Sequence, residues 1–255
     1  MPKLILLLSV FFITCLNVSA QISNPNVEKP TEGKKKKEKK AKKEKKEATT
    51  DLSQKATYYF TGAYLNSFRN FEDKTPYQSF AERNLETAIH TYGIGFGTFI
   101  PLAKNLDLEI GVSYVLQGEQ FNYSDSLSDS TFHYTKRYRH FGVPLRFKYS
   151  FGKNNFKTFV YGGVIPSSIL SYRYESDYTN KKGQTNDNNT VSKTNDLASF
   201  NVAVSAGFGL SYQLNNIGFL IIPEYRYNLL NTYDGTKVNH NLWSFGVNVG
   251  LTLKF

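Results

Sequence analysis

The chain ends with WSFGVNVGLTLKF, in which apolar and polar residues alternate without a break. One set of alternate positions holds only Trp, Phe, Val and Leu, and the other holds only Ser, Gly, Asn, Thr and Lys. Successive side chains of a β-strand point to opposite faces of a sheet, so this pattern predicts a strand with one apolar and one polar face. A helix would need apolar spacings of three and four residues, which the stretch lacks.

The same pattern recurs from residue 55 onward. Segments rich in Tyr, Phe and Val, which favour strands, are centred near residues 61, 95, 112, 143, 164, 206, 223 and 249. Two of their apolar faces run from Leu106 to Leu116 and from Phe200 to Tyr212. These faces are longer than the roughly five or six residues usual for strands of globular sheets.

The connections between these segments alternate in length. Long polar connections cover about residues 68–86, 119–133, 173–196 and 230–241. Short connections, which resemble tight turns, cover about residues 101–105, 151–155 and 214–217. An even number of strands with alternating long and short connections predicts an all-β fold, an eight-stranded antiparallel transmembrane up-and-down β-barrel over residues 55–255. In such barrels the long loops face the cell exterior and the short turns face the periplasm.

The polar faces of the strands are rich in Gly, Ser and Ala, which suits a narrow barrel interior. A soluble barrel or sandwich would instead bury the apolar faces. Tyr and Trp near the strand ends favour the membrane barrel, because aromatic residues gather at the two membrane interfaces.

Residues 1–54 carry no strand pattern. Lys3, a short apolar run and Val18-Ser19-Ala20 predict a signal peptide over residues 1–20. Residues 21–54 are a Lys-rich linker that we place in the periplasm, because an even strand count puts both chain ends on one side. Its segment Lys34–Lys46 is either a solvated spacer or a contact with anionic lipid or envelope polymer. A lipid anchor at Cys15 is disfavoured by the preceding Thr14.

The formal charge of +10 does not indicate a nucleic-acid-binding surface. Residues 28–47 carry eleven Lys and five Glu, and Lys3 belongs to the leader, so about +3 remains for the rest. Cys15 is the only cysteine, so the mature chain would have no disulfide and no thiol chemistry. The sequence contains no metal-ligand spacing, phosphate loop or nucleotide motif, and no cofactor is expected.

Charged residues fall on the polar, lumen-facing phase of three predicted strands. These are Asp107, Glu109, Arg146, Lys148, Glu224 and Arg226. If Leu106 pairs with Tyr149, Glu109 lies opposite Arg146 and Asp107 lies opposite Lys148. We predict that Glu109 and Arg146 form a pair in the lumen. Buried charges need partners, and side chains just fill the interior of an eight-stranded barrel. The charges therefore predict a salt-bridge network that plugs the lumen, with a proton or ion path as the alternative.

Two other features bear on the prediction. Asp125, Ser128, Asp129 and His133 could form a catalytic set at the outer rim, but polar loops commonly contain these residues, and an enzyme is disfavoured. Three prolines fall inside predicted strands, where they remove a ladder donor, and we interpret them as β-bulges. They are Pro144, Pro166 and Pro223.

The last strand resembles the assembly signal that the outer-membrane insertion machinery reads, because it ends in an aromatic residue after alternating apolar positions. The residues concerned are Trp243, Phe245, Val247, Val249, Leu251, Leu253 and Phe255.

Three further segments resemble the PorT-like outer-membrane β-barrel family. They are RHFGVPLRFKYSF (Arg139–Phe151), FKTFVYGGV (Phe156–Val164) and IIPEYRYNLLN (Ile221–Asn231). The resemblance covers about residues 55–255 and implies a barrel in the outer membrane of a Gram-negative bacterium. Through the founding member it also implies a link to a secretion and gliding apparatus.

These features together predict a non-enzymatic barrel that serves as scaffold, tether or accessory of an envelope or secretion complex. The alternatives are a rim-active enzyme that modifies lipid or cleaves protein, and a small channel or solute-binding barrel.

Overall fold

The computed structural model describes residues 56–73, 86–125, 129–152, 155–192, 197–233 and 238–254. Its strands are β1 (Thr57–Asp73), β2 (Glu86–Thr87), β3 (Ile89–Ala103), β4 (Leu106–Asp125), β5 (Ser130–Gly142), β6 (Leu145–Phe151), β7 (Phe156–Thr179), β8 (Thr185–Ser192), β9 (Asn201–Leu214), β10 (Ile217–Asn228) and β11 (Val238–Lys254). Within these residues no helix is long and apolar enough to cross a membrane.

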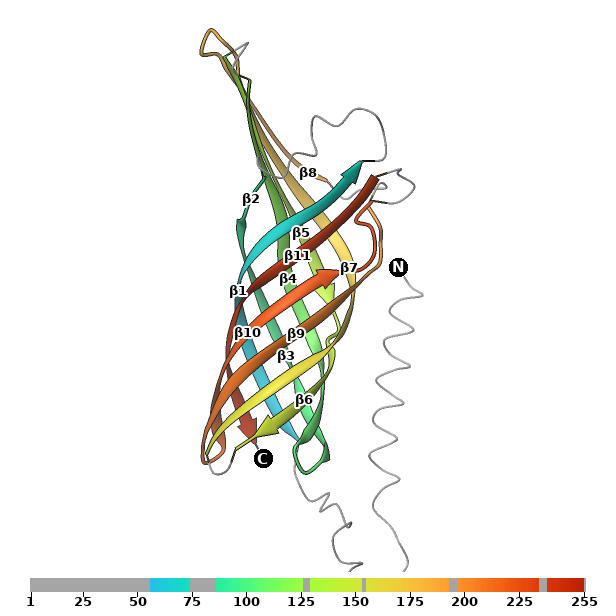
Figure 1. The fold of residues 1–255 in the computed structure, drawn as a ribbon, viewed down its shortest axis with the longest axis vertical. Helices are drawn as coiled ribbons and strands as arrows, with labels where there is room; N and C mark the ends of the chain where they lie inside the picture. The colour runs from blue at the N-terminus through green and yellow to red at the C-terminus, as the bar shows by residue number, and fades with distance from the viewer. Residues whose placement is uncertain are drawn as a thin grey trace, which may run out of the picture. The chain divides into compact units, whose positions relative to one another are not determined.

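The strands close into a ring of eight, which confirms the predicted barrel (Figure 1). Around the ring the order is β1, β3, β4, the joint strand β5–β6, β7, β9, β10 and β11, and every neighbouring pair is antiparallel. Closure comes from β11, which pairs with β1 from Lys254 opposite Thr57 to Val238 opposite Asp73. A closed ring leaves no backbone edge facing lipid, which is the condition for a sheet to span a membrane.

The strands β5 and β6 are one barrel strand, interrupted at Val143 and Pro144. Both halves keep the same register against β4 on one side and β7 on the other. The prediction of a bulge at Pro144 is therefore wrong. Proline removes one N–H from the ladder, but it adds no residue, so the pairing resumes in phase.

The other two prolines behave in the same way, and the bulge predictions at Pro166 and Pro223 are also wrong. Pro166 lies opposite Val202 in an unshifted ladder. The pairing of β10 with β9 stops at Ile222 and Pro223 and resumes in the same register. The shift in β7 lies instead at Leu170, which is the extra residue between the pairs His140–Ile169 and Arg139–Ser171.

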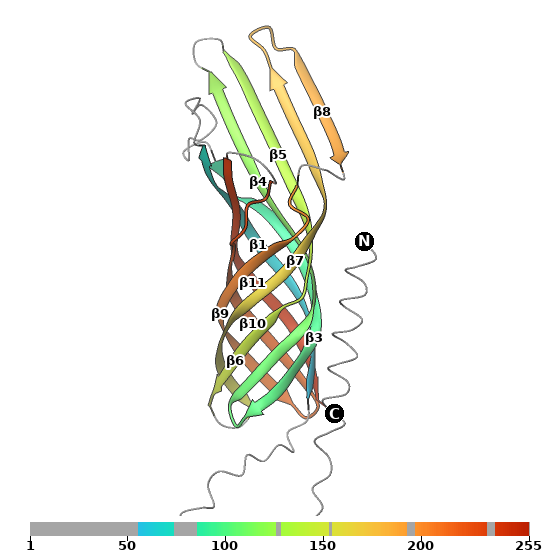
Figure 2. The same ribbon diagram turned by 90° about the vertical axis from the view of Figure 1, so that its right-hand side faces the viewer.

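The two ends of the barrel differ. At one end short turns join β3 to β4, β6 to β7 and β9 to β10, as the short connections predicted. At the other end β4, β5, β7 and β8 extend beyond the remaining strands as a ribbon of antiparallel strands (Figure 2). We call this part the outer ribbon. The prediction of loops over residues 119–133 and 173–196 is wrong for most of their length.

Polar faces point into the barrel and apolar faces point outward, as predicted. On β9 the inward Asn201, Ala203 and Ser205 are buried, whereas Phe208 and Tyr212 are exposed. Glycines give the interior its room. A Cβ on Gly97 or Gly111, which lie opposite each other, would come within 2.7 or 2.6 Å of the Tyr59 hydroxyl. Larger residues there would displace the Tyr59 ring from the lumen.

Candidate functional site

The lumen charges converge from three strands, and we call them with their partners the lumen network. Leu106 pairs with Tyr149, and Glu109 lies opposite Arg146 and Asp107 opposite Lys148, as the predicted register requires. Alternation along β4, β6 and β10 directs each of these side chains inward.

Glu109 and Arg146 form a two-pronged ion pair in the middle of the barrel. Arg146 donates from Nε to Glu109 Oε2 at 2.9 Å and from Nη2 to Glu109 Oε1 at 2.5 Å. The Tyr59 hydroxyl donates to the same Glu109 Oε1 at 2.7 Å. Glu109 is 3% exposed and Arg146 is 8% exposed, so water has little access to these hydrogen bonds and competes with them weakly. Arg–carboxylate pairs of this kind gain both energy and a defined geometry.

Glu224 forms the second centre of the lumen network. Its Oε2 accepts from Arg146 Nη1 at 3.0 Å, from the Tyr161 hydroxyl at 2.5 Å and from Asn248 Nδ2 at 2.7 Å. Arg226 Nε donates to the other carboxylate oxygen. Strands β6, β7, β10 and β11 are thereby cross-linked through one buried carboxylate.

Lys148 and Asp107 lie apart from these two centres, toward the short-turn end. Lys148 Nζ donates to Asp107 Oδ2 at 3.2 Å and lies 4.2 Å from the centroid of the Phe99 ring. The six predicted residues thus carry three negative and three positive charges. Their balance satisfies the condition that buried charges be paired.

Little space remains around the lumen network. Two cavities in the middle of the barrel have a volume of about 20 Å³ each. The first is lined by Arg146, Arg226 and Asn248 among others, and the second by Gln117, His140 and Asn228 among others. Each has room for about one water molecule, because a water needs roughly 10–15 Å³ of such volume.

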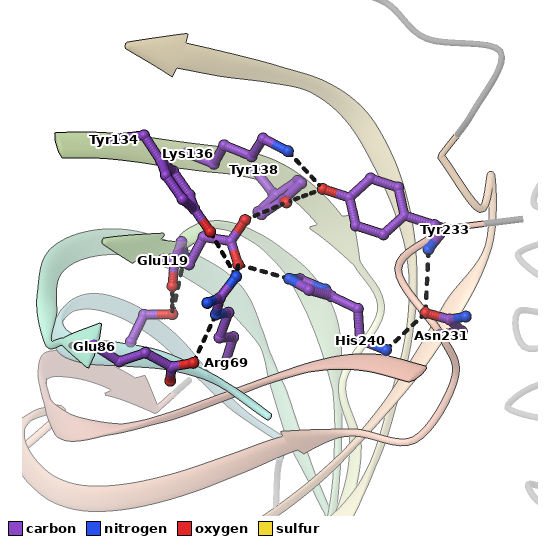
Figure 3. A network of polar contacts seen from close by, with 11 residues as sticks. Arg69, Glu86, Glu119, Tyr134, Lys136, Tyr138, Asn231, Tyr233 and His240 are labelled. Carbon is purple, nitrogen blue, oxygen red and sulfur yellow. Dashed lines mark hydrogen bonds and ion pairs between the residues drawn. The ribbon is translucent and has the colours of Figure 1, made fainter. Parts of the chain in front are cut away.

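A second polar group lies at the outer end of the lumen, and we call it the rim cluster (Figure 3). Its members are Arg69, Glu86, Glu119, Tyr134, Lys136, Tyr138, Tyr233 and His240. At the same level the outer surface carries charges, since Arg137 and Arg173 both bind Glu175 there. The rim cluster therefore lies above the apolar band of the barrel.

Glu119 is the centre of the rim cluster. Its carboxylate contacts His240 Nε2 at 2.7 Å, accepts from the Tyr138 hydroxyl at 3.1 Å and lies 3.6 Å from Arg69 Nη1. Burial alone raises the pKa of Glu119, but the electrostatic interaction and hydrogen bond with His240, together with the charge of Arg69, outweigh it and hold this pKa at about 2. Burial and the Glu119 carboxylate raise the pKa of Tyr138 well above its usual value.

The rim cluster also ties the β10–β11 connection to the outer ribbon. Lys136 Nζ donates to the Tyr233 hydroxyl at 2.9 Å, and the hydroxyls of Tyr138 and Tyr233 are 2.7 Å apart. The backbone N–H of His240 donates to Asn231 Oδ1 at 3.0 Å. These contacts fix the outer end of β11 against β5.

Sequence reasoning missed most of the rim cluster, although a signal was present. Glu119 continues the inward phase of Glu109 along β4, but residues 119–133 read as a loop because Ser, Asp and Thr dominate their second half. No motif in the sequence singles out His240. Its contact with Glu119 joins residues 121 positions apart, which sequence periodicity cannot show.

The structure places the suspected catalytic residues differently from the rim cluster. His133 Nδ1 contacts Asn122 Oδ1, and Asp129 lies 3.7 Å from Lys181 Nζ on the exposed surface. Ser128 lies outside the described residues. In the described ranges no group of three or more His, Cys, Asp or Glu side chains could hold a metal ion.

The terminal strand has its apolar residues on the outer face. Phe245, Val247, Val249, Leu251 and Leu253 are exposed. The Trp243 ring stacks on Phe68 with centroids 4.3 Å apart. Phe255, the segment Lys34–Lys46 and the predicted signal peptide lie outside the described residues, so these predictions stay predictions.

Several solved structures are similar to this chain. OprG from Pseudomonas aeruginosa has a TM-score of 0.39 and 13% identity, covering 79% of this chain and 98% of its own. Ail, the attachment invasion locus protein of Yersinia pestis, in complex with the heparin analogue sucrose octasulfate, has a TM-score of 0.36 and 13% identity, with coverages of 77% and 99%. The outer membrane enzyme PagL has a TM-score of 0.32 and 13% identity, with coverages of 76% and 97%.

Curated proteins gave no match to the chain. A family model described as "Outer membrane protein beta-barrel domain" matches residues 52–234, which include most of the described barrel. The eight-stranded ring, with its apolar outer face and polar lumen, agrees with this match. The chain therefore belongs to the outer membrane protein β-barrel domain family, and its barrel lies in the outer-membrane lipid of a Gram-negative bacterium.

Proposed function

We propose that this barrel is a non-enzymatic, non-conducting scaffold that serves as a tether or accessory in an envelope or secretion complex. One observation carries the proposal: the lumen network fills the middle of the barrel with paired charges, and the two cavities beside it measure about 20 Å³ each. An ion path would need a continuous hydrated passage, but side chains fill the interior of a barrel of eight strands.

The outer ribbon supports a scaffolding role. It extends β4, β5, β7 and β8 beyond the rest of the barrel and presents them above the membrane (Figure 2). The rim cluster anchors this ribbon to β11 and the lumen wall. The PorT-like segments in β5 to β7 and in β10 support an accessory role in a secretion apparatus, with other proteins of that complex as partners.

Conductance measurements test the closed lumen. We expect the folded mature chain, inserted into planar bilayers, to give no resolvable current steps in 1 M salt. Such salt shortens the Debye length to about 3 Å and screens charges, but it does not open a sterically filled path. A sixteen-stranded porin added to the same bilayers is the positive control, because its lumen is an aqueous channel. Steady current steps from the pure mature chain would contradict the scaffold proposal and favour a small channel.

An enzyme remains the second candidate, because His240 and Glu119 form a close pair at 2.7 Å at the outer rim. Their burial argues against it: His240 is 1% exposed and Glu119 3%, so a substrate cannot reach either group. Lipid and peptide substrates incubated with the mature chain and with a His240→Gln variant distinguish the two. Product formed by the wild type alone would favour the enzyme.

The Lys-rich segment Lys34–Lys46 gives a separate prediction. Because β1 begins at the short-turn end, we place this segment in the periplasm, where its lysines meet anionic lipid or envelope polymer. Each Lys contributes about 1 kcal/mol at best, and less as salt rises. Replacing these lysines by Gln should abolish co-sedimentation with anionic vesicles and envelope polymer at low salt.

Unchanged co-sedimentation of the Gln variant would mean that the segment Lys34–Lys46 is only a spacer. A variant with Lys181 and Lys182 replaced by Gln is the matched control, since both residues lie in the exposed β7–β8 turn at the opposite end. Protease access to the segment in intact cells would overturn the topology.

A further inference from the structure

A third cavity opens at the short-turn end of the barrel, and we call it the periplasmic mouth. Its volume is about 280 Å³, far larger than either cavity of the mid-lumen. Every barrel strand or an adjoining turn contributes to its wall, including Thr57 of β1, Ser150 of β6, Gln213 of β9 and Thr252 of β11. The apolar side chains of Phe99 and Leu220 line it on the side of the buried core.

The periplasmic mouth is strongly basic. Lys104, Lys148, Lys157 and Lys254 line it, and Asp107 is its one carboxylate among the described residues, so three positive charges are in excess. Lys148 is already bound to Asp107 at 3.2 Å. The other three lysines form no ion pair within the part of the chain that the structure describes. They come from the β3–β4 turn, β7 and β11, so their charges approach the cavity from different sides.

The chemistry of the lining selects among anions. Arginine is the side chain that matches a carboxylate with two parallel hydrogen bonds, and no arginine lines the periplasmic mouth among the residues that the structure describes. Lysine binds phosphate as a point charge. A phosphomonoester carries about −1.5 to −2 at neutral pH and three acceptor oxygens, so it offsets most of the excess charge in one group. Asn105, Asn155 and Ser211 add neutral polar groups for the remainder of such a ligand.

We propose that the periplasmic mouth is a binding site for a phosphate group carried on a small polar moiety of about glycerol or sugar size. A volume of about 280 Å³ is near the lower limit of small-molecule pockets and has room for a ligand of this size. The phosphate can come from a lipid headgroup of the inner leaflet or from a soluble phosphate compound of the periplasm. The site is independent of the scaffold proposal, because the lumen network behind Phe99 stays closed in either case.

The test uses the folded mature chain in neutral detergent micelles, titrated calorimetrically with inorganic phosphate, glycerol 3-phosphate and acetate at low salt. We expect saturable binding of both phosphate compounds, and weaker binding of acetate. Replacing Lys104, Lys157 and Lys254 together by Gln should weaken phosphate binding about 30-fold, or about threefold per exposed lysine. Heat-modifiable migration on gels verifies that the variant is folded.

The matched control removes three positive charges at the other end, by Lys181→Gln, Lys182→Gln and Arg139→Gln, and should keep wild-type phosphate binding. Equal weakening in both triple variants, absence of binding, or acetate binding as tight as phosphate would overturn the proposal.

The same titration in nanodiscs separates the two sources. Competition by phosphatidic acid, whose headgroup is a phosphomonoester, but not by phosphatidylcholine, identifies the lipid headgroup. Undiminished binding of glycerol 3-phosphate in both kinds of nanodisc identifies a soluble ligand.

Discussion

Replacing Glu109 by Gln is expected to destabilise the barrel by about 3–5 kcal/mol, and Arg146→Gln by a similar amount, because each change breaks a buried ion pair. Arg146 keeps only Glu224 as an ion-pair partner in the first variant, and Glu109 loses its ion-pair partner in the second. Arg146 loses a two-pronged bond when Glu109 becomes neutral. Glu109 keeps only the Tyr59 hydroxyl when Arg146 is removed. The measurement is the urea midpoint of unfolding for the mature chain in lipid vesicles.

Exchanging the two residues should recover much of this loss, but not all of it. Glu109→Arg with Arg146→Glu restores opposite charges across β4 and β6. The new carboxylate at position 146 then faces Glu224, which accepts from Arg146 at 3.0 Å in the wild type. Like charges at this distance repel, so the exchanged variant should remain less stable than the wild type.

Glu175→Gln supplies the control for these changes. Glu175 binds Arg137 and Arg173 on the outer surface, where its side chain is 33% exposed. Exposed pairs contribute about 0–1 kcal/mol, so this variant should unfold close to the wild type. If either single change at Glu109 or Arg146 leaves the midpoint unmoved, the ion pair does not stabilise the barrel.

The fold could be predicted from sequence because a membrane barrel repeats one simple rule. Each strand alternates between lipid and lumen, so the period of two identified all eight barrel strands and the direction of their faces. The predicted pair of Glu109 and Arg146 requires one register of β4 against β6, and the structure has this register. Asp107 and Glu109 on one strand, and Arg146 and Lys148 on the next, balance only when Leu106 pairs with Tyr149.

The outer ribbon was not predictable by that rule. Above the membrane neither face meets lipid, so polar residues occur on both faces, as in the β8 sequence TNDNNTVS. Such a segment reads as a loop, and it is the pairing of Tyr172–Thr179 with Thr185–Ser192 that makes it a strand. The rim cluster was not predicted for the same reason. Glu119 and Lys136 lie opposite each other in a region where apolar and polar residues no longer alternate regularly.

The prolines show a different limit. Sequence identifies a missing N–H at Pro144 and Pro223, but it cannot show how the sheet accommodates it. A bulge would shift every later residue to the wrong face, exposing charges such as Glu224 to lipid. Keeping the register loses one or two ladder hydrogen bonds, which costs less free energy than exposing charged residues to lipid. The register is kept at all three prolines.

Removing Phe255 is expected to reduce the inserted barrel in cells to a small fraction of the wild-type amount, with unfolded chain left in the periplasm. The resemblance of the last strand to an assembly signal motivates this prediction. Stability should hardly change, because the described ladder pairs of β11 end with Lys254 opposite Thr57 and Leu253 opposite Ile217. All of these pairs survive in a chain that ends at Lys254.

Two measurements on the same variants separate assembly from stability. Heat-modifiable barrel in outer-membrane fractions reports insertion, and the urea midpoint of chains refolded in detergent reports stability. Phe255→Tyr keeps an aromatic end and should insert normally, whereas Phe255→Ser should behave like the deletion. Refolded variants should match the wild type within about 0.5 kcal/mol, because every described ladder pair of β11 is kept. If the shortened chain inserts normally, the terminal aromatic is not read during assembly. If it inserts poorly and its midpoint also falls by several kcal/mol, the residue closes the barrel instead, since β11 is the strand that joins β10 to β1.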